Sequence, residues 1–480
     1  MLDALQQALS NQSISDFIIL EYNDEIGGRV THTAFGSGDQ IHTVELGANW
    51  VQGIHTPGGP ENPIWQLVKK YQLKNTYSNY SDILTYDETG AAEYSDLLDD
   101  FEEAYATLEQ DAGYILKQNL QDRSARVGLR LSGWTPKEDM HKQAVEWWEM
   151  DWEYSYPPDQ SSQEFTVVNY NTTFYQFSEE NNYVFDSRGF NAFIKGEATT
   201  FLKADDPRLL LSTVVTNITY NHDSVTVSTS GETCVKASYA ICTFSLGVLQ
   251  NNVVDFYPAL PQWKRDSIAT FQMGTYTKIF LQFPHVFWPQ DTQFFLYADP
   301  YTRGYYPVWQ SLDTAGFLPG SGIIFATVVD EQPYRIERMS DDAVKAELME
   351  VLYRMFGKAN VPDPTACLIP RWTKVPWAYG SYSNWPPSTT LEMHQNLRAN
   401  VGRVWFAGEA TSAEYYGFLH GAWFEGREVA GKVAACVNKV HGKDCIVDAS
   451  HEVLHGTTDE QEYDAANGWM VSSFQTIGDV

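Results

Sequence analysis

Two apolar runs, far apart in the chain, each end in a glutamate, and the first of these glutamates could bind a sugar. Glu21 follows the run 17–20, and Glu409 follows the run 404–408. In dinucleotide-binding units, an acid at the tip of a strand accepts hydrogen bonds from the ribose hydroxyls of adenosine. Many carboxylates at strand ends are only solvated, so this interpretation depends on the surrounding residues.

The turn that follows Glu21 contains Gly27, Gly28 and Arg29. Glycines permit tight turns and a close backbone approach that bulkier residues prevent, and a guanidinium pairs well with phosphate. The alternative is an ordinary loop with an exposed arginine.

A lysine and an acidic, tryptophan-rich segment could act on an amine. Lys278 lies in the apolar stretch YTKIFLQFP (276–284), where a strand would bury it and lower the pKa of its ammonium group. Lysines in strands usually reach water instead. Glu153 ends the segment WWEMDWE (147–153), and a carboxylate on an apolar wall attracts a protonated amine. Its neighbours Glu149 and Asp151 show that acids are common here.

Sequence patterns predict a mixed α/β fold that positions these residues. We expect a helix near 2–9, strands at 17–20 and 404–408, and a hairpin after Arg29, with a turn at 36–38. Residues 90–155 read as mostly helical, with a solvated acidic face at 99–103. A small β-meander is expected over 209–242, a buried strand at 323–329, and helices at 341–356 and 421–440.

Composition limits the remaining possibilities. The 480 residues suggest two or three domains, and the net charge of −30 makes nucleic acid an unlikely partner. No membrane-spanning run and no zinc-type cysteine spacing occurs. Cys436 and Cys445 could form a disulfide in an oxidising compartment. The compartment itself stays open, and a secretory route would require a signal segment ahead of residue 1.

Several motifs in order along the chain resemble the flavin-dependent amine oxidases, and plant-type polyamine oxidases in particular. They are LGANWVQG (46–53), YTKIFLQFP (276–284), SNWP (383–386) and FAGEATSAEYYGFLHGAW (406–423). The resemblance implies a discontinuous, Rossmann-like FAD-binding domain (1–75, 181–274 and 386–446), a substrate domain (76–180 and 275–385) and a tail (447–480).

The resemblance also implies roles for individual residues. Lys278 would be catalytic, holding a water against the flavin, and no metal is expected. Tyr382 and Phe418 would flank the reacting amine, with Gln52 and Glu153 also contacting substrate. FAD would be bound by Glu21, Gly27, Gly28, Arg29, Gly47, Ala48, Asn49, Trp50, Val215, Glu409 and Leu419.

Two features depart from the family pattern. Relatives begin with a strand and a GxGxxG loop whose amides bind the pyrophosphate, and Met1 falls where the helix after that loop is expected. We therefore expect the true start to lie upstream of Met1. Gln52 stands where plant-type relatives carry glutamate, which removes a charge that would attract substrate ammonium groups.

The resemblance implies a monomeric oxidase of a secondary amine in spermine or spermidine. Hydride transfer to flavin would yield an aminoaldehyde and an amine, and dioxygen would be reduced to hydrogen peroxide. Two alternatives stay open. One is an oxidase of the same fold that acts on another amine or an amino acid, and the other is a catalytically silent polycation-binding protein.

Overall fold

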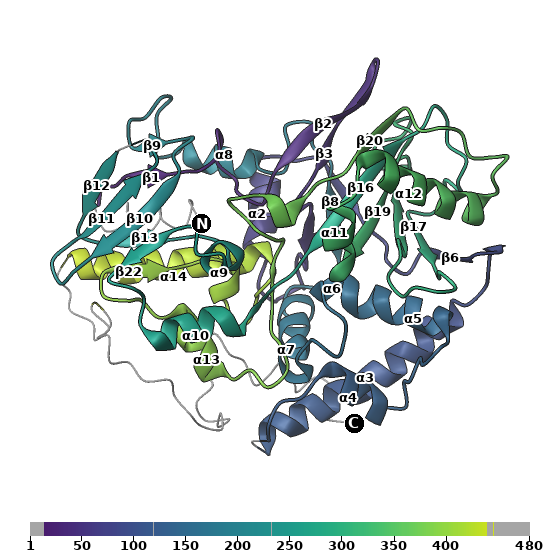
Figure 1. Ribbon diagram of the computed structural model, residues 1–480, viewed down its shortest axis with the longest axis horizontal. Helices are drawn as coiled ribbons and strands as arrows, with labels where there is room; N and C mark the ends of the chain where they lie inside the picture. Colours follow the sequence, from purple (N-terminus) through teal and green to yellow (C-terminus); the bar gives the residue numbers. More distant parts are fainter. Residues whose placement is uncertain (1–13, 119, 232, 439–444, 446–480) are drawn as a thin grey trace.

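A computed structural model of the protein describes residues 14–118, 120–231, 233–438 and 445. The helix expected near 2–9 and the tail from 447 lie outside these residues. The described elements form two halves, each with its own sheets and helices (Figure 1). The mixed α/β class predicted from the sequence is confirmed.

One half is built on a seven-stranded sheet. Its strands lie in the order β20 (Ala366–Leu368), β16 (Tyr276–Gln282), β19 (Ile323–Val329), β18 (Val308–Ser311), β17 (Phe294–Tyr297), β6 (Ile83–Asp87) and β7 (Gly90–Ala91). All these strands come from the two segments expected to form a substrate domain, although the exact domain boundaries stay a prediction. The buried apolar run of β19 appears where the sequence predicted it.

Helices cover both faces of this sheet. On one face, α12 (Asp341–Phe356) starts at Ser340, whose side-chain oxygen accepts a hydrogen bond from the Ala343 amide. Val344 and Leu348 of α12 pack against strand residues such as Ile324. The other face packs against a helical layer: α3 (Asp96–Lys117), α4 (Ala125–Leu131), α5 (Met140–Glu146), α6 (Trp152–Tyr154) and α7 (Gln163–Phe174).

A π-helical turn, η1 (Trp147–Asp151), joins α5 to α6. Asp139 caps α5, since its side chain accepts a hydrogen bond from the Lys142 amide. Single π turns within helices are frequent at functional sites, because they change which side chains share a face. Here the π turn lies inside the acidic, tryptophan-rich segment.

The other half contains the glutamates at the two strand ends. The expected meander is β10 (Val215–Tyr220), β11 (Val225–Thr229) and β12 (Cys234–Ala237), and β14 (Asp255–Tyr257) joins β10 in parallel. The meander is shorter than predicted, because β9 (Leu209–Leu210) pairs instead with β1 (Ile19–Leu20), and β13 (Ala240–Cys242) pairs with β22 (Val404–Phe406). Both of these pairs are parallel.

Short elements connect the two halves. The expected hairpin is β2 (His32–Ser37) and β3 (Gln40–Glu45), and β4 (Trp50–Gln52), β8 (Asn181–Val184) and β5 (Asn75–Tyr77) form a small sheet. A further pair is β15 (Gln272–Met273) with β21 (Ser383–Asn384). The remaining helices are α2 (Pro63–Lys70), α8 (Ala192–Ala198), α9 (Leu246–Gln250), α10 (Gln262–Thr270), α11 (Glu331–Ile336), α13 (Leu391–Arg398), α14 (Leu419–Val437) and the 3₁₀ turns η2 (Trp372–Lys374) and η3 (Glu409–Thr411).

Cys436, near the end of α14, forms a disulfide with Cys445, the pairing that the sequence suggested. None of the described helices combines the length and apolarity needed to cross a bilayer.

Candidate active site

A cavity of about 1890 Å³ extends through the molecule and collects the predicted site residues. Its wall includes strand ends of the half that contains β10, β11 and β12. It also includes residues of helices α3 and α7, which belong to the half with the seven-stranded sheet. Every residue that the sequence assigned to the cofactor or the substrate lines this cavity; Lys278 does not. These residues come from segments spread over nearly 400 positions, so only the fold brings them together.

The nucleotide end of the cavity is formed by strand ends. Glu21 follows β1 directly, and its Oε1 atom accepts hydrogen bonds from the Asn23 amide at 2.9 Å and the Asn23 side chain at 3.2 Å. Burial raises the pKa of Glu21 above its usual value. Val215, the first residue of β10, lines the same end. A half-buried carboxylate beside an apolar wall is suited to bind sugar hydroxyls beneath an adenine ring.

The facing strands at this end have few partners. Among the described residues, β1 pairs only with β9 and β13 only with β22, and residues of both β1 and β13 line the cavity. The strand and GxGxxG loop expected from the family pattern are not present among the described residues. In relatives, the backbone amides of this loop bind the pyrophosphate; no residue of the described part of this chain supplies such a loop.

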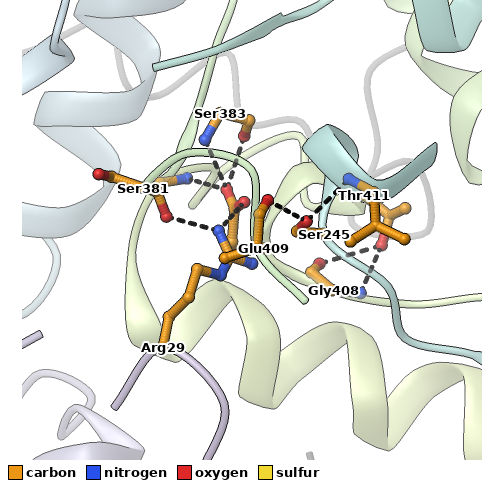
Figure 2. A network of polar contacts seen from close by, with 10 residues as sticks. Arg29, Ser245, Ser381, Ser383, Gly408, Glu409 and Thr411 are labelled. Carbon is orange, nitrogen blue, oxygen red and sulfur yellow. Dashed lines mark hydrogen bonds and ion pairs between the residues drawn. The ribbon is translucent and has the colours of Figure 1, made fainter. Parts of the chain in front are cut away.

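Arg29 and Glu409 form an ion pair at the centre of a polar network (Figure 2). Arg29 Nη1 donates to Glu409 Oε1 at 2.8 Å and to the Ser381 carbonyl at 2.7 Å. Glu409 Oε2 accepts hydrogen bonds from the Ser383 hydroxyl at 2.6 Å and the Gly417 amide at 2.8 Å. Both residues line the cavity, so this network ties the turn after Glu21 to the strand end at Glu409.

Glycines keep the wall open beside this network. A Cβ atom built on Gly28 or Gly408 would meet no atom within 4 Å, and both residues line the cavity. At Gly47, in contrast, a Cβ would lie 1.7 Å from the Arg29 carbonyl oxygen, so only glycine allows the two backbones to approach. Gly47, Ala48 and Asn49 thereby form a smooth stretch of wall that leads to Trp50.

Lys278 lies behind that stretch of wall. Its ammonium nitrogen donates to the Gly47 carbonyl at 2.7 Å and to Asn49 Oδ1 at 3.0 Å, and lies 5.9 Å from the Trp50 ring centre. The side chain is 1% exposed, as the apolar strand predicted. Burial lowers the pKa of Lys278 and raises that of its neighbour Glu45. The family pattern places this lysine beside a flavin-bound water. In this structure its ammonium group instead bonds to oxygens of Gly47 and Asn49, and the side chain lies behind the cavity wall.

Aromatic rings surround the middle of the cavity. The Tyr382 hydroxyl donates to the Glu153 carbonyl at 2.9 Å, and its ring centre lies 5.9 Å from that of Tyr276. A Cβ atom on Gly417 would lie 3.3 Å from Tyr382 Cδ2, which places the backbone before Phe418 against this ring. Phe418 is 4% exposed and also lines the cavity. The rings exclude water from the place where an amine would react.

Acids line the cavity beyond the rings. Glu153 follows the π turn, and burial raises its pKa to about 7. Glu149, within the π turn, has its pKa raised to about 8 by burial and by repulsion from Glu102. Asp99 and Glu102 of α3, expected only as a solvated face, are exposed and also line the cavity. This stretch of wall is therefore rich in acids, and a bound cation would favour the charged forms of its buried carboxyl groups.

Gln52 ends β4 and lines the cavity. Its backbone carbonyl accepts a hydrogen bond from Asn62 Nδ2 at 3.0 Å, which fixes the strand end. A neutral amide at this position adds no charge to the acidic wall.

Residue pattern and cavity together fit FAD. The half-buried Glu21 at the nucleotide end suits the ribose, the open glycines and Arg29 suit the phosphates, and the flat 47–50 wall suits an aromatic ring. A model of the family described as flavin containing amine oxidoreductase matches residues 7–434. The chain belongs to this family. It is an FAD-dependent amine oxidase.

Individual relatives agree with this assignment. The chain is 38% identical to "Polyamine oxidase 1" of Zea mays over 90% of this chain and 88% of that protein. It is 38% identical to "Polyamine oxidase 7" of Oryza sativa subsp. japonica over 87% of this chain and 89% of that protein. The structure of wild-type putrescine oxidase bound to putrescine covers 90% of this chain and 96% of its own chain, with a TM-score of 0.70 at 17% identity. That likeness supports the fold.

Sequence reasoning missed several residues of the amine-binding part. Glu109, Tyr105 and Tyr170 line it from the middles of α3 and α7. Tyr276 lies two residues before Lys278 in the same motif, so the alternation of a strand could have indicated it. Nothing in the helical segments distinguishes the others from ordinary core and surface residues.

Proposed function

We propose that this enzyme oxidises a secondary amine of spermine or spermidine, and that the acidic wall selects the polycation. The observation that carries the proposal is the distribution of charge along the cavity. The cavity-lining residues between 77 and 179 include acids on α3, η1, α6 and the segment after α7, and no lysine or arginine. Among all described residues that line the cavity, the cationic side chains are Arg29 and Lys236.

This charge distribution favours amines over amino acids. An amino-acid substrate needs a cation for its carboxylate, and Arg29 is already paired with Glu409 while Lys236 lies on β12, in the meander. A protonated polyamine carries several positive charges along a flexible chain, and the unpaired carboxylates of Glu153 and Glu149 would bind them strongly where little water competes.

The proposed reaction removes two electrons from the substrate. When bound, FAD supplies the acceptor for a hydride from the carbon beside the nitrogen, and passes the electrons to dioxygen. Water then cleaves the resulting imine, so that amine, dioxygen and water yield an aminoaldehyde, a smaller amine and hydrogen peroxide.

The chain's own residues orient the substrate for this step. Tyr382 and Phe418 would hold the reacting carbon and nitrogen between them, with Tyr382 fixed by its hydrogen bond to the Glu153 carbonyl. Glu153, at the near end of the acidic wall, would hold a neighbouring ammonium group. Lys278 would stabilise the wall of residues 47–50, because its ammonium group bonds to two oxygens of that wall.

The test is a comparison of substrates with the FAD-loaded protein. We expect hydrogen peroxide and an aminoaldehyde from spermine or spermidine, and no peroxide from a panel of amino acids. Peroxide from an amino acid or from a simple monoamine in preference to the polyamines would refute the proposed substrate class. Spermine binding without any peroxide would favour a catalytically silent polycation-binding protein.

A further inference from the structure

Residues of α3, the π turn and α7 line one region of the cavity near Glu153, since the charges of Glu153 and Glu149 both act on Tyr170. We call this region the distal chamber; its wall includes Glu102, Tyr105 and Glu109 of α3, Glu149 of η1 and Tyr170 of α7. The Tyr105 and Tyr170 ring centres lie 6.4 Å apart with their planes at 69°. The chamber therefore combines aromatic faces with carboxylates, a combination that suits an organic cation.

Glu109 gives an independent sign of a ligand. The residue is 5% exposed, and its Oε1 atom is buried without a hydrogen-bond partner. A hydrogen bond with Asn171 serves the carboxyl group of Glu109 and lowers its pKa, but burial has the larger effect and raises the pKa to about 7. An acid in this position is costly to the fold unless something else satisfies it. An ammonium group that enters the cavity would supply the missing donor.

Glu149 has no ion pair within the described part of the protein, although acids on either side of it do. Glu146 accepts hydrogen bonds from Arg126 and Arg303, and Asp151 from Arg303. The π turn thus places Glu146 and Asp151 against arginines and leaves Glu149 on the cavity wall. Its carboxyl group is available to a charged ligand.

The spacing of the acids fits a polyamine. Glu149 and Glu153 are four residues apart on one continuous helical segment, so their Cβ atoms lie roughly 5–6 Å apart. Nitrogens joined by three or four methylene groups are separated by roughly the same distance when the chain is extended, given standard bond lengths. One ammonium group at Glu153 would place the next one at Glu149.

We propose that Glu149 and Glu109 form a second ammonium subsite in the distal chamber, which holds the outer nitrogen of a long polyamine while the reacting amine lies near Tyr382. This inference rests on the proposed function and specifies it further: the chamber would make the enzyme prefer amines with an additional cationic arm.

The test compares two ligands in binding and in turnover. Spermine carries outer ammonium groups, whereas N-butylpropane-1,3-diamine keeps one secondary and one primary amine and lacks the additional arm. Dithionite-reduced, FAD-loaded protein cannot turn over, so calorimetry under nitrogen measures the affinity for each ligand alone. The variants are Glu149→Gln and Glu109→Gln, and their circular dichroism and thermal unfolding check that each is folded.

We expect each variant to weaken spermine binding roughly tenfold and to raise the KM for spermine by a similar factor, with kcat little changed. Binding of the short diamine should stay within twofold of the wild type. Glu149→Asp, which keeps the charge, should recover part of the loss. Glu103→Gln on the exposed face of α3 is the matched control, since it removes the same charge outside the cavity and should change neither ligand.

The outcomes separate the subsite from the oxidase proposal. Unchanged spermine affinity in both variants, or equal weakening of both ligands, would overturn the subsite even if spermine is oxidised. A selective loss of spermine affinity, with no flavin reduction by any polyamine in the wild type, would support the subsite and refute the oxidation.

Discussion

Two sides of one short helical segment show how partners decide what a buried acid does. Glu146 and Asp151 are 0% and 1% exposed and face arginines. Arg303 Nη2 lies 2.9 Å from Glu146 Oε1 and 2.7 Å from Asp151 Oδ1. Glu149 and Glu153 lie on the cavity side, without such partners.

The difference separates structural acids from binding acids. Paired carboxylates hold the π turn to the seven-stranded sheet, because Arg303 lies in the connection between β17 and β18. Burial raises the pKa of the unpaired Glu153 and Glu149 to about 7 and about 8, whereas Arg303 opposes the effect of burial on Asp151, whose pKa rises to about 6. Such unpaired acids are stabilised by a cationic ligand instead, and this is the basis of the proposed substrate selectivity.

Arg303→Met gives the largest expected effect, because it leaves the buried Asp151 carboxylate unpaired and removes one of the two arginines that bind Glu146. We expect the free energy of unfolding to fall by about 3–5 kcal/mol, as is typical when one partner of a buried ion pair is removed. Urea unfolding of the variant, with Arg303→Lys as the charge-conserving control, measures it. A loss below about 1 kcal/mol would show that these acids are not held by the arginine and would remove the contrast with Glu149.

Lys278→Met tests whether a buried lysine that is hydrogen-bonded to the cavity wall contributes to the reaction. The substitution removes two hydrogen bonds from the 47–50 wall, and we expect amine-driven flavin reduction to slow by roughly 10–100-fold while FAD stays bound. Anaerobic stopped-flow absorbance measures the rate, and the flavin-to-protein absorbance ratio checks the cofactor. Unchanged reduction kinetics would exclude a catalytic or positioning role for Lys278.

Glu153→Gln should weaken the near end of the acidic wall. We expect the KM for spermine to rise roughly tenfold with a smaller change in kcat, since the charge attracts the substrate equally before and during reaction. Steady-state peroxide assays compare it with Glu103→Gln. A fall in kcat at unchanged KM would instead place Glu153 in the chemical step.

Because Glu149 has no ion-pair partner among the described residues, we expect it to make the free energy of unfolding depend on pH. The pKa is raised from 4.5 to about 8 in the folded protein, so the folded state holds the extra proton between these values, and this contribution to stability is lost as the pH rises through the window. We therefore expect Glu149→Gln to be more stable than the wild type at pH 8, by at least about 1 kcal/mol, and equal to it near pH 4. Urea titrations at both pH values measure the difference, and equal stability at pH 8 would contradict it.

The sequence predicted the framework better than the amine-binding wall. An unbroken apolar run indicated β19, and apolar residues at helical spacing indicated α12, because local patterns determine these elements. The ends of two apolar runs indicated Glu21 and Glu409. The pairing of strands that are distant in the sequence was harder to predict. We assigned residues 209–210 to the meander, but they pair with β1. Such pairing depends on tertiary contacts that no local pattern shows.

The roles of neighbouring acids were also beyond sequence reasoning. Glu149 and Asp151 are two residues apart in WWEMDWE, yet one lines the cavity and the other pairs with Arg303. Their separation depends on a π turn and on an arginine about 150 positions away. The proposed second ammonium subsite follows from that geometry alone.

An anaerobic titration of the FAD-loaded protein with spermine tests the central claim most directly. The account predicts that the oxidised flavin absorbance near 450 nm is lost as about one spermine per flavin is added, and returns when dioxygen is admitted. A flavin spectrum that stays oxidised in excess spermine, in a protein that binds both FAD and spermine, would contradict it.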